Sequence, residues 1–257
     1  MRDNHWSRHA AQLAEAYARN RGQLSFELIR RAIARHVPPG PRRIVDVGGG
    51  YGQQAITLAR DGHTVTVLDF DPNMLDLARR RLEGEPPEVR ARVELVLGDG
   101  LDAPAVVGSD FDVACCHSVL MYEEEPAPFV AGVVGTVRPG GLVSLLSLNP
   151  EAAAMRSAVK GRWQEARATL EAGRETGAQY LPTSEPSLAE VTALLEKFGA
   201  HVQEWYGVGL FTEHAGMPAD PEAAADAYEV EWLAGSRDPF RGVARCFHVV
   251  AAVDPPS

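Results

Sequence analysis

The chain has 257 residues, of which 45% are hydrophobic and 23% charged, a composition typical of a globular domain and unlike that of disordered or fibrous proteins. The 25 Lys and Arg residues against 35 Asp and Glu residues give a formal net charge of −10, which argues against nucleic acid as the default partner. The first residues lack the features of a secretory signal and no apolar run is long enough to span a bilayer, so we expect a cytoplasmic protein without membrane contact.

The N-terminal half alternates between helical and strand patterns. Residues 1–40 predict two helices, because apolar side chains recur at helical spacing until Pro38 and Pro39 end the pattern. From residue 43 onward, short Val-rich runs alternate with longer helical stretches, as in a parallel sheet covered by helices. The predicted strands are residues 44–47, 64–68, 93–97, 111–116 and 142–148, and the predicted helices are residues 53–60, 72–82 and 126–137.

The C-terminal half predicts an insertion, three further helical or strand elements and an acidic segment. Residues 151–186 are helical by composition and predict no strand, so we expect a helical insertion over the sheet and the active site. Ser187 and Glu190 form a capping box that starts a helix ending before Gly199. Strands are predicted at residues 201–211 and 244–253, separated by an acidic helical segment within residues 213–240.

These elements predict an α/β fold in one domain spanning residues 1–257. The expected sheet is doubly wound, Rossmann-like, seven-stranded and mostly parallel, with the last two strands closing one edge and a helical insertion as a cap. Cys115, Cys116 and Cys246 have neither disulfide nor zinc-ligand spacing, so we expect buried reduced thiols and no metal site.

A glycine-rich turn follows the first predicted strand. Gly48, Gly49 and Gly50 come directly after that strand and Asp46, where a doubly wound sheet opens its ligand crevice. Glycines allow positive φ and let a ligand touch the main chain. Asp69 ends the next predicted strand, where a carboxylate can accept hydrogen bonds from ribose hydroxyls. A tight strand-to-helix turn without a ligand is the alternative for the glycines.

The spacing of these glycines is similar to motif I of class I S-adenosylmethionine-dependent methyltransferases. The dinucleotide-binding pattern fails, because its last glycine position is Gln53. The resemblance implies S-adenosyl-L-methionine as cofactor, with S-adenosyl-L-homocysteine as product. The resemblance implies that Gly48, Gly49 and Gly50 approach the methionine part, that Asp46 positions this loop or the ammonium group, and that Asp69 holds the ribose. Phe70 is a further implied cofactor contact. Asp99 or Asp102 would accept from the adenine amine beside Gly100 and Leu101, either aspartate being a turn residue in the alternative interpretation.

Two further side chains are candidates for catalysis. His117 ends the fourth predicted strand, where ligand contacts of this fold project, and Tyr122 follows it closely. Histidine can accept a proton near neutral pH, so we predict His117 as a contact to the cofactor or the acceptor and as first candidate general base, with Tyr122 second.

A narrower resemblance is to the bacterial tRNA 5-carboxymethoxyuridine methyltransferase family. It is carried from about Gly22 to Ala252 by the block from Val45 to Leu75, His117, the Arg138-Pro139-Gly140-Gly141 turn, and Arg245 with His248. Tyr180 and Arg245 are the predicted substrate contacts. Two departures concern RNA: Ser25 replaces an arginine of that family, for which Arg30 or Arg31 could compensate, and the family's lysine-rich run is missing from residues 151–186.

Three functions therefore compete. The acidic balance favours methyl transfer to an oxygen or nitrogen of a small molecule, and the narrower resemblance favours the tRNA carboxyl group. The third is a protein that binds S-adenosylmethionine without catalysis. Aromatic side chains of the C-terminal half, Trp163, Tyr180, Trp205, Tyr206 and Phe211, either line an acceptor pocket or form a small core of their own. The sequence gives no indication of the oligomeric state.

Overall fold

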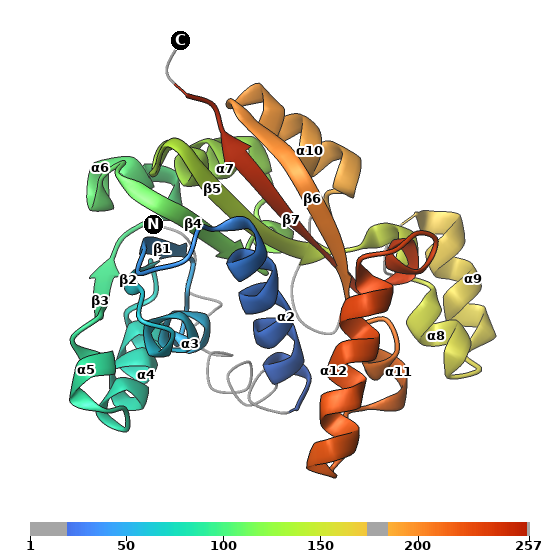
Figure 1. Ribbon diagram of the computed structural model, residues 1–257. Coiled ribbons are helices and arrows are strands. Elements are labelled where there is room, and N and C mark those ends of the chain that lie inside the picture. Colours follow the sequence, from blue (N-terminus) through green and yellow to red (C-terminus); the bar gives the residue numbers. More distant parts are fainter. Residues whose placement is uncertain (1–19, 174–184, 256–257) are drawn as a thin grey trace.

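The computed structural model describes residues 20–173 and 185–255, which form a seven-stranded sheet with helices on both faces (Figure 1). The strand order is β3-β2-β1-β4-β5-β7-β6. β1 to β5 run parallel, whereas β7 pairs antiparallel with both β5 and β6. The strands are β1 (Arg43–Val47), β2 (Thr64–Asp69), β3 (Val93–Leu97), β4 (Phe111–His117), β5 (Val137–Leu148), β6 (Ala200–Val208) and β7 (Cys246–Val253). The predicted α/β architecture, including the two closing strands, is confirmed.

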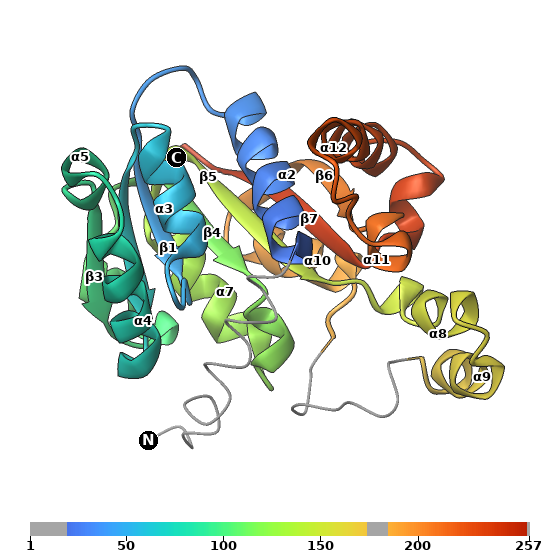
Figure 2. The same ribbon diagram turned by 90° about the horizontal axis from the view of Figure 1, so that it is seen from below.

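Two layers of helices bury the two faces of this sheet. The helices are α2 (Asn20–His36), α3 (Gln53–Arg60), α4 (Pro72–Glu83), α5 (Pro87–Arg90), α6 (Ala103–Val107), α7 (Pro126–Gly135), α8 (Met155–Val159), α9 (Trp163–Ala172), α10 (Leu188–Lys197), α11 (Thr212–Ala215) and α12 (Pro221–Gly235). Short 3₁₀ turns cover Gly100–Asp102, Leu120–Tyr122, Pro150–Ala152 and Phe240–Val243. Figure 2 shows α2, α3 and α12 on one face of the sheet and α7 and α10 on the other.

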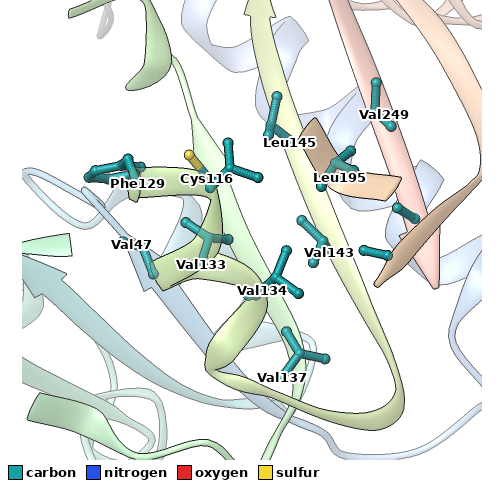
Figure 3. Close-up of a cluster of buried hydrophobic side chains, with 14 of the residues drawn as sticks. Val47, Cys116, Phe129, Val133, Val134, Val137, Val143, Leu145, Leu195 and Val249 are labelled. Atoms are coloured by element: carbon teal, nitrogen blue, oxygen red, sulfur yellow. The ribbon is translucent and has the colours of Figure 1, made fainter. Parts of the chain in front are cut away.

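The core on the α7 side consists of packed apolar side chains, most of them aliphatic (Figure 3). Phe129, Val133 and Val134 of α7 and Leu195 of α10 pack over the strands. Because β1, β4 and β5 are covered on both faces, their residues are apolar in near-continuous runs rather than alternating. This explains why the Val-rich runs were recognisable as strands.

Two strand boundaries differ from the prediction by more than two residues. β5 begins at Val137 instead of residue 142, because the chain from residue 138 to 141 bulges out between the pairs Phe111–Val137 and Val113–Leu142 and rejoins the ladder. β6 ends at Val208 instead of residue 211, since Gly209 takes a φ of 76° and the next amides bond elsewhere. The capping box is confirmed: Ser187 Oγ accepts from Glu190 N, and the Glu190 carboxylate accepts from Ser187 N.

The predicted insertion is described only in part. Residues 150–173 fold as a 3₁₀ turn followed by α8 and α9, which lie beside α11 beyond the end of the sheet (Figure 1). The first predicted N-terminal helix and Tyr180 lie outside the described residues. Among the helices that the structure describes, none combines the length and apolar character needed to cross a bilayer.

Candidate functional site

A cavity of ≈ 1040 Å³ opens at the edge of the sheet where β1, β2 and β4 end. Most of its lining residues come from two groups of elements, which lie on opposite sides of β4 in the strand order. The glycine-loop half is lined from β1, β2 and β3 by Asp46, Gly48, Gly49, Gly50, Asp69, Phe70, Gly98, Gly100 and Leu101. The arginine half is lined from β5 to β7, α8 and α11 by Leu148, Arg156, Val208, Gly209, Thr212, Glu213, Arg245 and Cys246. The amino-terminal part of α2 contributes Leu24 and Ser25 to the wall.

Glycine is required at the start of the β1 loop for space as well as for conformation. Gly48 has a φ of 72°, and a Cβ there would lie 2.6 Å from Cγ2 of Val119. A Cβ at Gly49 would lie 2.7 Å from Oδ2 of Asp46. The loop therefore lies tightly against Val119, which follows β4, and against the Asp46 carboxylate, and its main chain forms part of the cavity wall.

Asp69 ties this loop to β2. Its Oδ2 accepts a hydrogen bond from Gly50 N at 2.8 Å, and its Oδ1 accepts one from Asp71 N at 2.9 Å. Burial raises the pKa of the Asp69 carboxyl to about 6, although these two hydrogen bonds oppose the shift. Each carboxylate oxygen has two acceptor sites, so Asp69 can accept further hydrogen bonds from a ligand.

Asp46 is fully buried in the cavity wall. Within the part of the chain that the structure describes, no group donates a hydrogen bond to its Oδ2. Burial and, secondarily, the charge of Asp69 raise the pKa of Asp46 to about 7. The described ion pairs include neither Asp46 nor Asp69. This wall is therefore suited to a ligand with positive charge.

Of the four predicted adenine contacts, two line the cavity and two do not. Gly98, Gly100 and Leu101 line the cavity, and a Cβ at Gly100 would lie 2.4 Å from Cε2 of Phe129, so the chain packs tightly on α7. The side chains of Asp99 and Asp102 do not line the cavity. Asp99 Oδ1 instead accepts from Leu101 N at 3.0 Å, and Asp102 is exposed. Asp99 thus takes the turn position of the alternative interpretation, whereas Asp102 lies in the same 3₁₀ turn without a capping hydrogen bond from its side chain.

His117 lines the cavity but is also part of a polar network under the sheet surface. His117 Nε2 lies 2.9 Å from Ser144 Oγ, which lies 2.8 Å from Nε2 of His248. A hydroxyl donates only one hydrogen bond, so at least one of the two rings carries its proton on Nε2. Burial lowers the pKa of His117 to about 3. His117 is consequently neutral and a weak base near pH 7, which argues against the predicted general-base role. Tyr122 lies in the same wall.

In the arginine half, an ion pair joins two elements that are distant in the sequence. Arg156 Nε of α8 lies 3.5 Å from Glu213 Oε1 of α11. Arg245 lines the same region, and its backbone N–H donates to Gly209 O at 3.2 Å. The sequence predicted Arg245 here but not Arg156 or Glu213, because nothing in their local patterns indicates that α8 and α11 meet. Tyr180, the other predicted substrate contact, is outside the described residues.

The other aromatic candidates are not part of the cavity lining. Trp163 is 70% exposed and Phe211 45% exposed. Trp205 lies under the guanidinium of Arg241, 4.1 Å from ring centroid to Cζ, and Tyr206 stacks on Trp232. For these four residues the acceptor-pocket interpretation is wrong.

The two arginines that could have compensated for Ser25 are engaged with carboxylates of the same chain. Arg30 pairs with Glu27 at 2.7 Å and with Asp61 at 3.3 Å. Arg31 pairs with Glu229 at 2.6 Å and lies over the Trp232 ring. These neighbouring charges offset the positive field that a nucleic-acid phosphate would need.

Comparisons with known proteins agree with this geometry. A family model described as "Methyltransferase domain" matches residues 45–145. The chain is 25% identical over 251 residues to the tRNA 5-carboxymethoxyuridine methyltransferase of Escherichia coli (strain K12), covering 93% of this chain and 94% of that protein. It is 30% identical over 176 residues to a ubiquinone biosynthesis O-methyltransferase of Xylella fastidiosa (strain 9a5c), covering 68% of each.

The fold has solved counterparts as well. A possible histamine N-methyltransferase from Thermotoga maritima superposes with a TM-score of 0.63 at 14% identity, covering 97% of this chain and 98% of that one. The names of these three relatives refer to unlike acceptors. Similarity therefore does not identify what occupies the arginine half.

Proposed function

We propose that this chain, which belongs to the S-adenosylmethionine-dependent methyltransferases, transfers a methyl group to an oxygen or nitrogen of a small-molecule acceptor. The observation that carries the proposal is the single cavity that runs from the glycine loop, past His117 and Tyr122, to Arg156 and Arg245. In this proposal the glycine-loop half holds the cofactor and the arginine half holds the acceptor.

The glycine-loop half fits S-adenosylmethionine in charge and shape. Its sulfonium and ammonium groups are cationic, and Asp46 offers an oxygen without a donor in the described structure. Asp69 has acceptor capacity left for ribose hydroxyls, and in this proposal the adenine lies against the cavity wall that Gly98, Gly100, Leu101 and Phe129 form. When bound, this cofactor supplies a methyl group that its sulfonium charge already activates.

The protein's own contribution is orientation in a pocket with restricted water. Apolar side chains such as Leu24, Ile29 and Leu146 line the cavity around His117. Holding the acceptor atom in line with the methyl group removes most of the entropic barrier, so a strong base is needed only for an acceptor that must lose a proton. For such an acceptor we propose Tyr122 as the contact, since His117 is too weakly basic.

The charges around the cavity favour a small acceptor over tRNA. Glu123, Glu124 and Glu125 line the cavity on the β4 side, and Glu213 lies in the arginine half. Carboxylates in these positions repel a phosphate backbone, whereas Arg245, beside the Arg156–Glu213 pair, can bind one carboxylate or phosphate group of a small molecule. The tRNA carboxyl group remains the second candidate, supported by the similarity that covers most of the chain.

The proposal is tested by incubating the protein with methyl-labelled S-adenosylmethionine and, separately, bulk RNA and a small-molecule extract. We expect label in the small-molecule fraction and none in RNA. Label in RNA alone would replace the proposal by the tRNA reaction. Label in neither fraction, together with cofactor binding by calorimetry, would leave a protein that binds S-adenosylmethionine without catalysis.

A further inference from the structure

Glu231 is a fully buried carboxylate that lies outside the cavity and bonds to the turn that lines it. Its exposure is 0%, and it belongs to α12, which contributes no side chain to the cavity. Glu231 Oε2 accepts from Leu210 N at 2.9 Å, and Oε1 accepts from Phe211 N at 2.9 Å and Thr212 N at 2.7 Å. The Thr212 hydroxyl donates to Oε1 at 2.7 Å. Four donors from three consecutive residues thus converge on one side chain.

Two close contacts with β6 hold α12, and thereby the Glu231 carboxylate, in a fixed position relative to the turn. A Cβ at Gly235 would lie 2.3 Å from Gly207 O, so the helix lies directly against β6. One turn earlier, Trp232 stacks on Tyr206 with ring centroids 5.0 Å apart. Glu231 therefore lies directly before two contacts that fix α12 on β6, and the turn must adopt the shape that its carboxylate dictates.

The turn carries the acceptor side of the cavity. Gly209, Thr212 and Glu213 all line the arginine half. Gly209 O accepts a hydrogen bond from the backbone N–H of Arg245, which fixes the main chain that carries this side chain, and Glu213 pairs with Arg156 of α8. Every polar group described above in the arginine half is therefore attached to this turn directly or through one partner, whereas none of the glycine loop is.

We propose that Glu231 is a positioning residue for the acceptor: it presets the 209–213 turn, and through it Arg245 and the Arg156–Glu213 pair, so that loss of its carboxylate weakens acceptor binding and spares cofactor binding. This inference rests on the proposed function for the identity of the two halves. It assigns acceptor selectivity to a side chain that touches neither ligand.

The sharpest variant is Glu231→Gln, which keeps the size and one acceptor oxygen. The remaining oxygen can serve the three donors at Oε1, but the amide then faces Leu210 N–H, donor against donor. The matched control is Glu229→Gln on the same helix, because Glu229 is exposed and pairs with Arg31 away from the cavity. The acceptor for this test is the small-molecule fraction that becomes labelled in the transfer assay. The concentration of this fraction that gives half-maximal transfer should be about 10-fold higher for Glu231→Gln than for the wild type.

The maximal rate of Glu231→Gln should change by less than about threefold, and its affinity for S-adenosylhomocysteine by less than about twofold. Glu229→Gln should match the wild type in all three quantities. A parallel loss of acceptor and S-adenosylhomocysteine affinity would reduce Glu231 to a structural residue and overturn the inference. Unchanged acceptor half-saturation would overturn it as well.

Amide hydrogen exchange tests the same inference without any acceptor and in the wild-type protein. The amides of residues 210–212 should exchange as slowly as those of β6, because a buried carboxylate holds them. In Glu231→Gln their exchange should accelerate while that of the glycine loop stays unchanged. Fast exchange of residues 210–212 in the wild type would overturn the inference. Protected amides combined with no label in any extract would instead refute the proposed function alone.

Discussion

The two halves of the cavity handle their charges in opposite ways. In the glycine-loop half, Asp46 and Asp69 are buried without a described cation, and the pKa of each carboxyl is raised. In the arginine half, Glu213 faces Arg156, and Glu231, which lies outside the cavity, accepts four hydrogen bonds from the turn that lines this half. The carboxylates of the glycine-loop half are therefore compensated by a positively charged ligand. Those around the arginine half are compensated by groups of the protein, so this half selects its acceptor by the positions of these groups.

The largest effect that tests this difference between the two halves is expected on substitution of Asp46. Its carboxyl ionises near 3.8 in the unfolded chain and near 7 in the fold, so between these pH values the folded state retains a proton that the unfolded state has lost. Rising pH therefore destabilises the ligand-free protein until about pH 7. In Asp46→Asn this loss is absent, and the variant should gain on the order of 4 kcal/mol relative to wild type between pH 4 and pH 8.

Urea unfolding of both proteins at pH 4.5, 6 and 8 without ligand measures this gain. Asp69 titrates with the same sign, with a pKa of about 6, so the wild-type slope contains both groups and the difference between the proteins isolates Asp46. Calorimetry should show S-adenosylmethionine binding more tightly to the wild type as pH rises from 5.5 to 8. A stability difference that does not vary with pH would mean that Asp46 is not destabilised by ionisation.

The second prediction concerns Asp69 and sharpens the contrast within the glycine-loop half. Asp69→Asn removes the charge and leaves one of the amides of Gly50 and Asp71 facing a donor. We expect about 100-fold weaker binding of S-adenosylmethionine, since a charged hydrogen-bonding partner is lost in a buried site. The measurement is calorimetric titration, with Asp99→Asn as control because Asp99 faces its own turn. An Asp99→Asn defect as large as that of Asp69→Asn would return Asp99 to the adenine site.

The glycine-loop half was largely predictable from the sequence because its signals are local. Asp46 lies near the end of β1, Gly48 follows it, and Asp69 ends β2. The Val-rich runs of both strands are recognisable, and parallel strands bring their carboxyl ends to one edge of the sheet. Steric contacts such as that of Gly48 with Val119 then add only detail. The sequence was least decisive at Asp99 and Asp102, because turn-forming and ligand-binding aspartates share the same residue type and position.

The arginine half was not predictable, because its geometry depends on contacts between distant segments. Arg156 meets Glu213 only where α8 packs beside α11, and no spacing in the sequence encodes that meeting. Glu231 lay in a stretch that reads as a solvated acidic helix, yet it is completely buried. The overlong strand prediction at residues 201–211 has the same origin, since Glu231 captures the amides that would have continued the ladder.

The third prediction tests whether the arginine half selects the acceptor alone. Arg245→Gln should lower transfer to the small-molecule acceptor about 10-fold at limiting acceptor, because a guanidinium that can bind an anionic group is lost. S-adenosylhomocysteine affinity, measured by calorimetry, should remain within about twofold of wild type because Arg245 lies on the far side of β4 from the glycine loop. Arg42→Gln, on the loop before β1 and outside the cavity lining, is the control. Weakened S-adenosylhomocysteine binding in Arg245→Gln would mean that the halves are not separate.

The smallest effect is expected at Arg31, where an unchanged transfer activity would support a small acceptor over RNA. Arg31 is already paired with Glu229 and stacked over Trp232, so Arg31→Gln should lower the melting temperature by no more than about 3 °C and leave transfer to the small-molecule acceptor unchanged. An RNA substrate would change this expectation, because removing one phosphate-binding cation weakens RNA binding and flattens its salt dependence. Filter binding of bulk tRNA to wild type and Arg31→Gln across a salt series measures both. If Arg31→Gln lost RNA affinity with a reduced salt slope, the cations of α2 would serve a nucleic acid and the acceptor would extend beyond the cavity.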